Sequence, residues 1–210
     1  MKIVKAAFAS LVLFSSTTLI PGQPAKAEPS QTTFQLVPSK PLISCMAANS
    51  NVTPSATVVV KRGKLNDSMT ITLKNFKPGL KFDLFTIQKT NLLANGNSDP
   101  NFKGFGLAWY QTDLEPGTAT IKTILLDQIF GLNSDANLSL PPTNTFHVGF
   151  WFNNPADAAA CGFDVNKPTP FNGEHKAGPL AFISVPNPQT NLGPLCLKPN
   201  TSTSPATCDP

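Results

Sequence analysis

Apolar and polar positions alternate repeatedly along the middle of this chain. In the segment MTITLKNF (69–76), Met69, Ile71 and Leu73 share one face, while threonine and lysine occupy the other. Alternation with a period of two is typical of a strand that is buried on one side. The same pattern, bounded by turn residues, predicts seven strands, at 57–62, 69–76, 80–87, 104–110, 118–125, 145–152 and 180–185.

Short turns between strands that each have one apolar face are typical of an antiparallel sandwich. The sequence therefore predicts an all-β protein, an Ig-like β-sandwich of about seven strands with long loops. A short helix is expected at 154–162 in the last inter-strand connection, with Asn154 as N-cap, Pro155 in the first turn and Gly162 after its end. The segment 125–132 has weaker helical spacing.

The ends of the chain differ from its middle in composition. Residues 1–27 combine Lys2 and Lys5, an uncharged apolar run and a final Ala-Lys-Ala, which together predict a signal peptide cleaved after Ala27. Residues 28–55 are expected to form an extended lead-in and 56–186 the β-sandwich domain. Residues 187–210, rich in Pro, Thr and Ser, are expected to form a loosely ordered tail. The predicted location is the periplasm, the cell surface or the surrounding medium.

Charge narrows the range of partners. Cleavage after Ala27 removes three lysines and no acid, so the net charge falls from +4 to +1. Arg62 is the single arginine that would remain, and clustered Lys/Arg of the kind that binds phosphate backbones is absent from the sequence. Nucleic acid is therefore excluded as a partner. No segment of the mature chain is apolar over the length that a membrane-spanning helix needs.

All four cysteines lie outside the predicted signal peptide, and an even number in an exported chain favours disulfides. In an Ig-like order of strands, Cys45 precedes the first strand and Cys161 lies between the sixth and seventh, which places both at one end of the sandwich. Cys196 follows the seventh strand and belongs at the other end with Cys208. The predicted pairs are therefore Cys45–Cys161 and Cys196–Cys208.

The stretch FNGEHKAGP (171–179) carries one of the two histidines beside a carboxylate. Glu174 and His175 could join His147 in a Zn site. However, His147 begins the sixth strand whereas His175 precedes the seventh, so the two would lie at opposite ends of a hairpin. We therefore interpret each histidine as a surface side chain. A metal-dependent enzyme with His175 and neighbouring carboxylates as ligands is the alternative.

Other catalytic patterns lack a motif in this sequence. There is no G-x-S-x-G elbow, and disulfides would remove the cysteines as nucleophiles. Several acids are expected near one end of the sandwich, where they could pair as in a glycosidase or hold Ca²⁺. Their spacing matches no EF-hand, so solvated turns explain them more simply. These acids are Asp113, Glu115, Asp157, Asp164 and Glu174.

Aromatic side chains suggest a carbohydrate site as a further alternative. Tyr110 and Trp151 are expected off the core face, while Trp109 alternates in phase with core positions. The sequence as a whole predicts a secreted, non-catalytic binding or structural module that has no cofactor and that meets an extracellular protein or glycan. Its working surface is expected in the connection 153–178, because functional residues concentrate on long loops held by a rigid scaffold. The candidate ligand-binding residues are Tyr110, Trp151, Asp164, Glu174 and His175.

Overall fold

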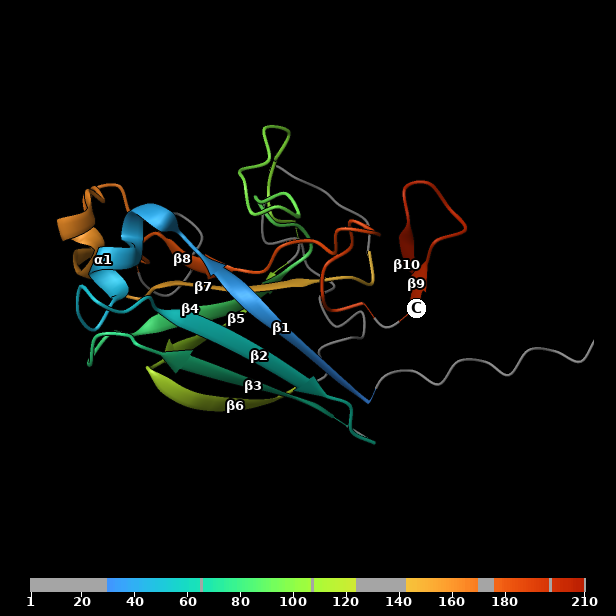
Figure 1. Ribbon diagram of the computed structural model, residues 1–210, viewed down its shortest axis with the longest axis horizontal. Coiled ribbons are helices and arrows are strands. Elements are labelled where there is room, and N and C mark those ends of the chain that lie inside the picture. The colour runs from blue at the N-terminus through green and yellow to red at the C-terminus, as the bar shows by residue number, and fades with distance from the viewer. Residues whose placement is uncertain are drawn as a thin grey trace, which may run out of the picture.

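The computed structural model describes residues 30–64, 66–106, 108–123, 143–169, 176–196 and 198–209. The predicted signal peptide, and the segment 125–132 with helical spacing, lie outside these residues. The described part contains ten strands and three short helices, all joined by loops (Figure 1). None of its helices has the length and apolar character that a membrane-spanning helix requires.

The fold is all-β and antiparallel, as the alternation predicts. Each of the seven predicted segments overlaps a strand, and three further strands, β1, β9 and β10, were not predicted. The strands are β1 (Gln31–Pro38), β2 (Ser55–Lys61), β3 (Asp67–Lys74), β4 (Phe82–Ile87), β5 (Ala108–Leu114), β6 (Gly117–Thr123), β7 (His147–Phe152), β8 (Leu180–Ile183), β9 (Lys198–Asn200) and β10 (Thr207–Asp209). The Ig-like assignment itself stays a prediction.

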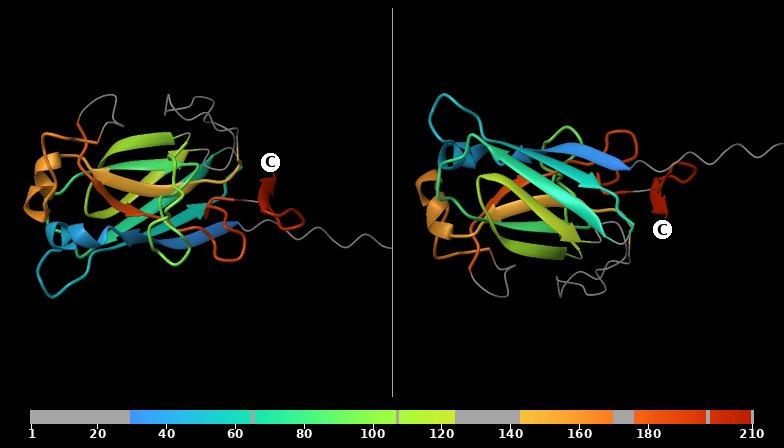
Figure 2. Two further views of the ribbon diagram at one scale, coloured as in Figure 1. Left: turned by 90° about the horizontal axis from the view of Figure 1, so that it is seen from above. Right: turned by 90° about the horizontal axis from the view of Figure 1, so that it is seen from below.

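Eight of the strands form one curled sheet in the order β5-β4-β7-β8-β1-β2-β3-β6. The turning point is β1, which pairs with β2 through residues 31–36 and with β8 through Val37 and Pro38. The strands on either side of β1 therefore lie face to face, as the views from above and below show (Figure 2). Between them lies the main core, which includes Val58 and Ile71 from one side and Phe150 from the other.

The segment 28–55, predicted to form an extended lead-in, contains the strand β1. Phe34 and Leu36 point inward and pack with the main core, while Gln31, Thr33 and Gln35 are exposed. After Pro38 the chain continues into η1 (Lys40–Leu42) and α1 (Ile43–Met46). The lead-in is thus an integral strand followed by two helical turns, and it joins the two sides of the sheet.

The predicted strand 104–110 is displaced along the chain in the structure. Residues 104–106 lie in the loop before β5, and Gly106 has a φ of 76°, which strand residues with a side chain rarely adopt. The strand itself begins at Ala108 and extends to Leu114. Glycines that alternate with apolar residues therefore marked a loop that leads into the strand.

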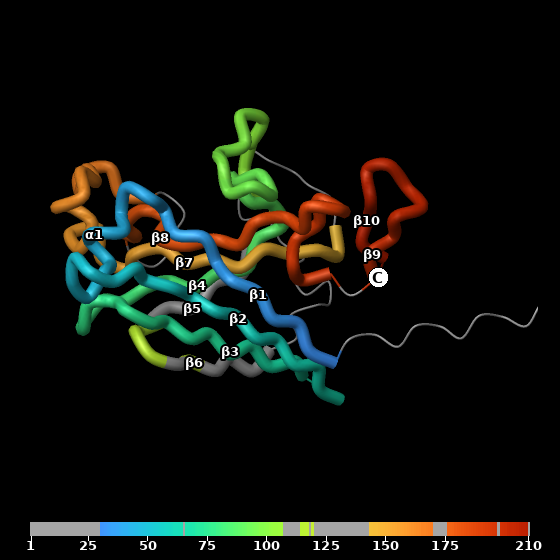
Figure 3. The backbone as a smooth tube through the Cα atoms, viewed as in Figure 1, coloured from blue at the N-terminus to red at the C-terminus, as the bar shows by residue number. Residues whose placement is uncertain are grey.

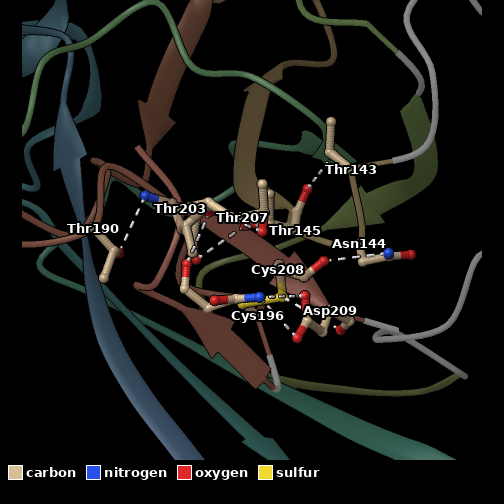
Figure 4. Close-up of a disulfide and its surroundings, with 12 residues drawn as sticks. Thr143, Asn144, Thr145, Thr190, Cys196, Thr203, Thr207, Cys208 and Asp209 are labelled. Carbon is tan, nitrogen blue, oxygen red and sulfur yellow. Dashed lines mark hydrogen bonds between the residues drawn. A yellow bond between two sulfur atoms is a disulfide. The ribbon is translucent and has the colours of Figure 1, made fainter. Parts of the chain in front are cut away.

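The C-terminal segment, predicted to form a loosely ordered tail, is bridged to the chain just before β7. Phe146 and Leu195 form a two-way backbone bridge, with N–O distances of 3.0 and 3.1 Å. Beyond it, β9 and β10 form a small hairpin that carries the Cys196–Cys208 disulfide. The Asn144 side chain donates to the carbonyl of Cys208, 3.3 Å away (Figure 4). The described residues of this segment, 187–196 and 198–209, are thus linked to the sheet by backbone and side-chain hydrogen bonds.

Candidate functional site

The connection 153–178 begins with the predicted short helix. This helix, η2 (Pro155–Cys161), is a 3-10 helix, and the Asn154 side chain accepts a hydrogen bond from the Ala156 N–H at 3.0 Å. Gly162 follows with a φ of 87°, a conformation that favours glycine. The helix and both of its predicted caps are confirmed.

The first anchor of this connection is a disulfide to the N-terminal part of the chain. Cys45 in α1 is bonded to Cys161 at the end of η2, with the Cα atoms 6.1 Å apart. The two helices lie side by side at one end of the molecule (Figure 1). Both predicted pairs, Cys45–Cys161 and Cys196–Cys208, are present. Two disulfides are compatible with an oxidising compartment.

The second anchor closes the far part of the connection. The Thr169 N–H donates to the carbonyl of Ala177 at 2.9 Å, and the Thr169 hydroxyl donates to the carbonyl of Gly178 at 2.6 Å. Gly178 in turn donates its N–H to the carbonyl of Phe152 at 2.7 Å. A side chain at Gly178 would place its Cβ 2.8 Å from that of Phe152, so glycine permits this close approach. Thr169 and Ala177 are therefore neighbours on the scaffold.

Two of the predicted ligand-binding residues, Glu174 and His175, lie outside the described residues. Asp164 lies within the described residues, and its carboxylate interacts with residues of its own turn. Its carboxylate accepts a hydrogen bond from the Asn166 N–H at 3.0 Å and lies 3.8 Å from the Lys167 ammonium. In the same connection, partial burial raises the pKa of Asp157. The proposed acidic group is thus not assembled by the described residues.

The aromatic prediction is corrected for Trp151. Its side chain is 4% exposed and lies 4.2 Å, between ring centroids, from Phe85. It belongs to a second apolar cluster on the outer face of β4, β7 and β8, with Phe85, Ile87, Ala177 and Ile183. A ring buried in this way offers no platform to a sugar. The backbone of Tyr110 lies in β5, and its side chain is outside what the structure describes.

His147 is also placed differently from the prediction of a surface imidazole. Its side chain is 3% exposed, and Nδ1 lies 3.0 Å from the hydroxyl oxygen of Ser184. The same hydroxyl accepts a hydrogen bond from the Val148 N–H at 3.1 Å. Burial lowers the pKa of His147 to about 4, because the charged imidazolium would lose its hydration. The side chain is therefore neutral at physiological pH.

The long loop between β4 and β5 was not singled out from the sequence. It crosses the outer face of the sheet, where Phe105 packs against Trp151 with ring centroids 6.3 Å apart. Its length was the available signal, because loops of this size without secondary structure usually have a purpose. Within the described ranges, no three His, Cys, Asp or Glu side chains come together as a potential metal site.

Comparison with protein families, curated proteins and solved structures finds no match to this chain.

Proposed function

We propose that this chain is an exported, non-catalytic binding or structural module of the extracellular or cell-surface space, and that the connection 153–178 is its working surface. The observation that carries the proposal is the double anchoring of this connection, by the Cys45–Cys161 disulfide and by the Thr169–Ala177 pair. A loop tied down at both ends can present side chains to a partner at little cost in conformational entropy.

The scaffold we propose is an Ig-like β-sandwich. Taken in chain order from β2, the strands β2-β3-β6 pack opposite β4-β7-β8, which is the grouping of the first, second and fifth strands against the third, sixth and seventh. In this interpretation β5 joins the second group at its edge and β1 is an addition. The export half of the proposal is supported by the signal-peptide pattern of residues 1–27 and by the two disulfides.

Substitution of two residues of the connection tests the binding surface. The mature chain, labelled at its N-terminus, is titrated onto intact cells of the producing organism and onto a glycan array. We expect a Glu174→Gln/His175→Gln variant to lose most of the binding, because charge and hydrogen bonding at the loop would be altered. A Lys64→Gln/Asn66→Gln variant in the exposed β2–β3 turn is the control. Equal binding by the loop variant and the wild type would contradict the use of this surface.

Native mass spectrometry tests the non-catalytic half against a metal-dependent enzyme. Protein secreted without reductant should have the mass of residues 28–210 less four hydrogens, as two disulfides require. No stoichiometric metal is expected. A metal adduct that disappears in His175→Ala but persists in Lys176→Ala, the substitution of its exposed neighbour, would overturn the proposal in favour of the enzyme.

A further inference from the structure

A cavity of about 350 Å³ lies where β1 passes to β8, beneath the first part of the β4–β5 loop. Its floor includes Val37, Leu180 and Ile183. Its walls are formed by residues 38–41 on one side and, on the other, by Asn91, Leu92 and residues 96–98 of the segment 91–98. The loop stands above the sheet at this place (Figure 3). None of the lining residues belongs to the connection 153–178, so this site is separate from the surface proposed above.

Both walls are held in place without a ligand. In the 91–98 wall, the Leu93 N–H donates to the carbonyl of Asn97 and the Gly96 N–H to that of Leu93, each at 2.8 Å. The Asp99 N–H closes the turn on the carbonyl of Asn91 at 2.9 Å. In the opposite wall, two prolines restrict the backbone and the Ser39 N–H donates to the carbonyl of Ala181 at 2.8 Å. The cavity is therefore preformed, which lowers the cost of binding.

The same loop fills the space under its second part. Phe102 and Phe105 pack with tilted rings whose centroids are 4.7 Å apart, and Phe105 contacts the buried Trp151. The first part carries Asn91, Gly96, Asn97 and Ser98 at the cavity, and Leu92 is the one large apolar residue that it places in the lining. The second part of the loop is thus packed against the sheet, whereas a cavity remains under the first part. A volume near the lower end of the range of ligand pockets suits a small molecule.

The lining determines which small molecule fits. The floor is apolar, so the body of the ligand should be hydrocarbon. Lys40 is the charged residue among those lining the cavity, its side chain is exposed, and no described carboxylate lies within ion-pair distance of it. Its charge is therefore available to a ligand. We propose that this cavity binds a small amphiphilic anion, with its hydrocarbon on Val37, Leu180 and Ile183 and its head group at Lys40.

Titration calorimetry of the mature, oxidised chain with sodium octanoate tests this proposal. We expect saturable binding with a dissociation constant of about 1 mM or lower, which corresponds to partial burial of the alkyl chain. Octan-1-ol should bind more weakly than octanoate, and octyltrimethylammonium should bind more weakly still, because Lys40 would repel the cation. A Lys40→Gln variant should weaken octanoate binding roughly two- to fivefold and leave octan-1-ol unchanged, as expected for an exposed ion pair.

A blocking variant identifies the cavity itself. Ser98→Trp places a large ring at the exposed rim and should abolish binding of both octanoate and octan-1-ol. Asn101→Trp, an exposed position of the same loop away from the cavity, is the matched control and should bind normally. The proposal is overturned by any of three results. These are octanoate binding that survives Ser98→Trp, equal binding of the cationic amphiphile, or no saturable binding below the micelle concentration of octanoate.

Discussion

Replacing both Cys45 and Cys161 by alanine should lower the free energy of unfolding by about 5 kcal/mol, the loop-entropy value for a closed ring of this size. The bonded residues are 116 positions apart, so the disulfide closes a large loop and restricts the conformations of the unfolded chain. Cys45 is also 3% exposed and packs in the main core, which adds a cost for the lost contacts.

The second disulfide is the internal control for this prediction. Cys196 and Cys208 are 12 positions apart, and the same loop-entropy relation gives about 3 kcal/mol. Urea unfolding of the wild type and of each double-alanine variant, followed by tryptophan fluorescence, measures both effects. If the Cys196→Ala/Cys208→Ala protein is the less stable of the two variants, ring size does not govern the contribution of the disulfides.

The pairing of the cysteines could be predicted from the sequence although three strands were not. The prediction needs only the direction of the chain through consecutive antiparallel strands. Cys45 lies between β1 and β2, so adding β1 before it does not change the end of the sheet to which it belongs. The same holds for Cys161, because the β7–β8 connection was identified correctly. The alternating direction of consecutive strands is thus sufficient to predict the cysteine pairs, even when the number of strands is not predicted correctly.

The sequence did not predict the strand β1 because its alternation of apolar and polar residues is weak. Its inward side holds Thr32, Phe34 and Leu36, of which two are strongly apolar, and Pro38 closes the segment. Prolines are excluded from central strands only where a backbone N–H is needed. Pro38 lies at the end of β1, opposite Phe182 of β8, where β1 has already left β2. A central strand that changes its partner can therefore carry a proline.

The candidate site was predicted in outline but not in its side chains. Alternation was taken to mean one buried face per strand, which placed Trp151 and His147 outside. All six residues of β7 are buried, as are all six of β4. The cause is the β4–β5 loop, which covers the outer face with Phe105 and Leu92. A large aromatic on the supposedly polar face, such as Phe85 or Trp151, was the available sign that something covers that face.

The burial of His147 leads to the second large effect, a loss of stability as the pH falls. In the folded chain its pKa is about 4, compared with an ordinary value of 6.5. Protons therefore bind the unfolded chain more readily between these values, and stability rises with pH across that window. The contribution of His147 to the free energy of unfolding is complete above pH 6.5 and is lost progressively as the pH falls to about 4. The free energy of unfolding should fall by about 3 kcal/mol from the upper to the lower end of this pH range.

A variant that keeps the local hydrogen bond but cannot titrate isolates this effect. His147→Asn offers Ser184 a side-chain amide in place of Nδ1 and remains neutral at every pH used. We expect it to be less stable than the wild type at neutral pH, because asparagine fills less of the site. The gap between the two proteins should shrink as the pH falls from 6.5 to 4, since only the wild type pays for its buried imidazole.

Urea unfolding at a series of pH values measures that gap directly. Carboxylates that titrate in the same range affect both proteins alike, so the difference between the two unfolding free energies reports His147 alone. His175→Asn serves as the control and should follow the wild-type curve. A gap between wild type and His147→Asn that stays constant over the window would mean that His147 accepts a proton in the folded chain without penalty. The imidazole would then have to reach solvent at low pH, and the closed packing of β7 beneath the β4–β5 loop would not hold there.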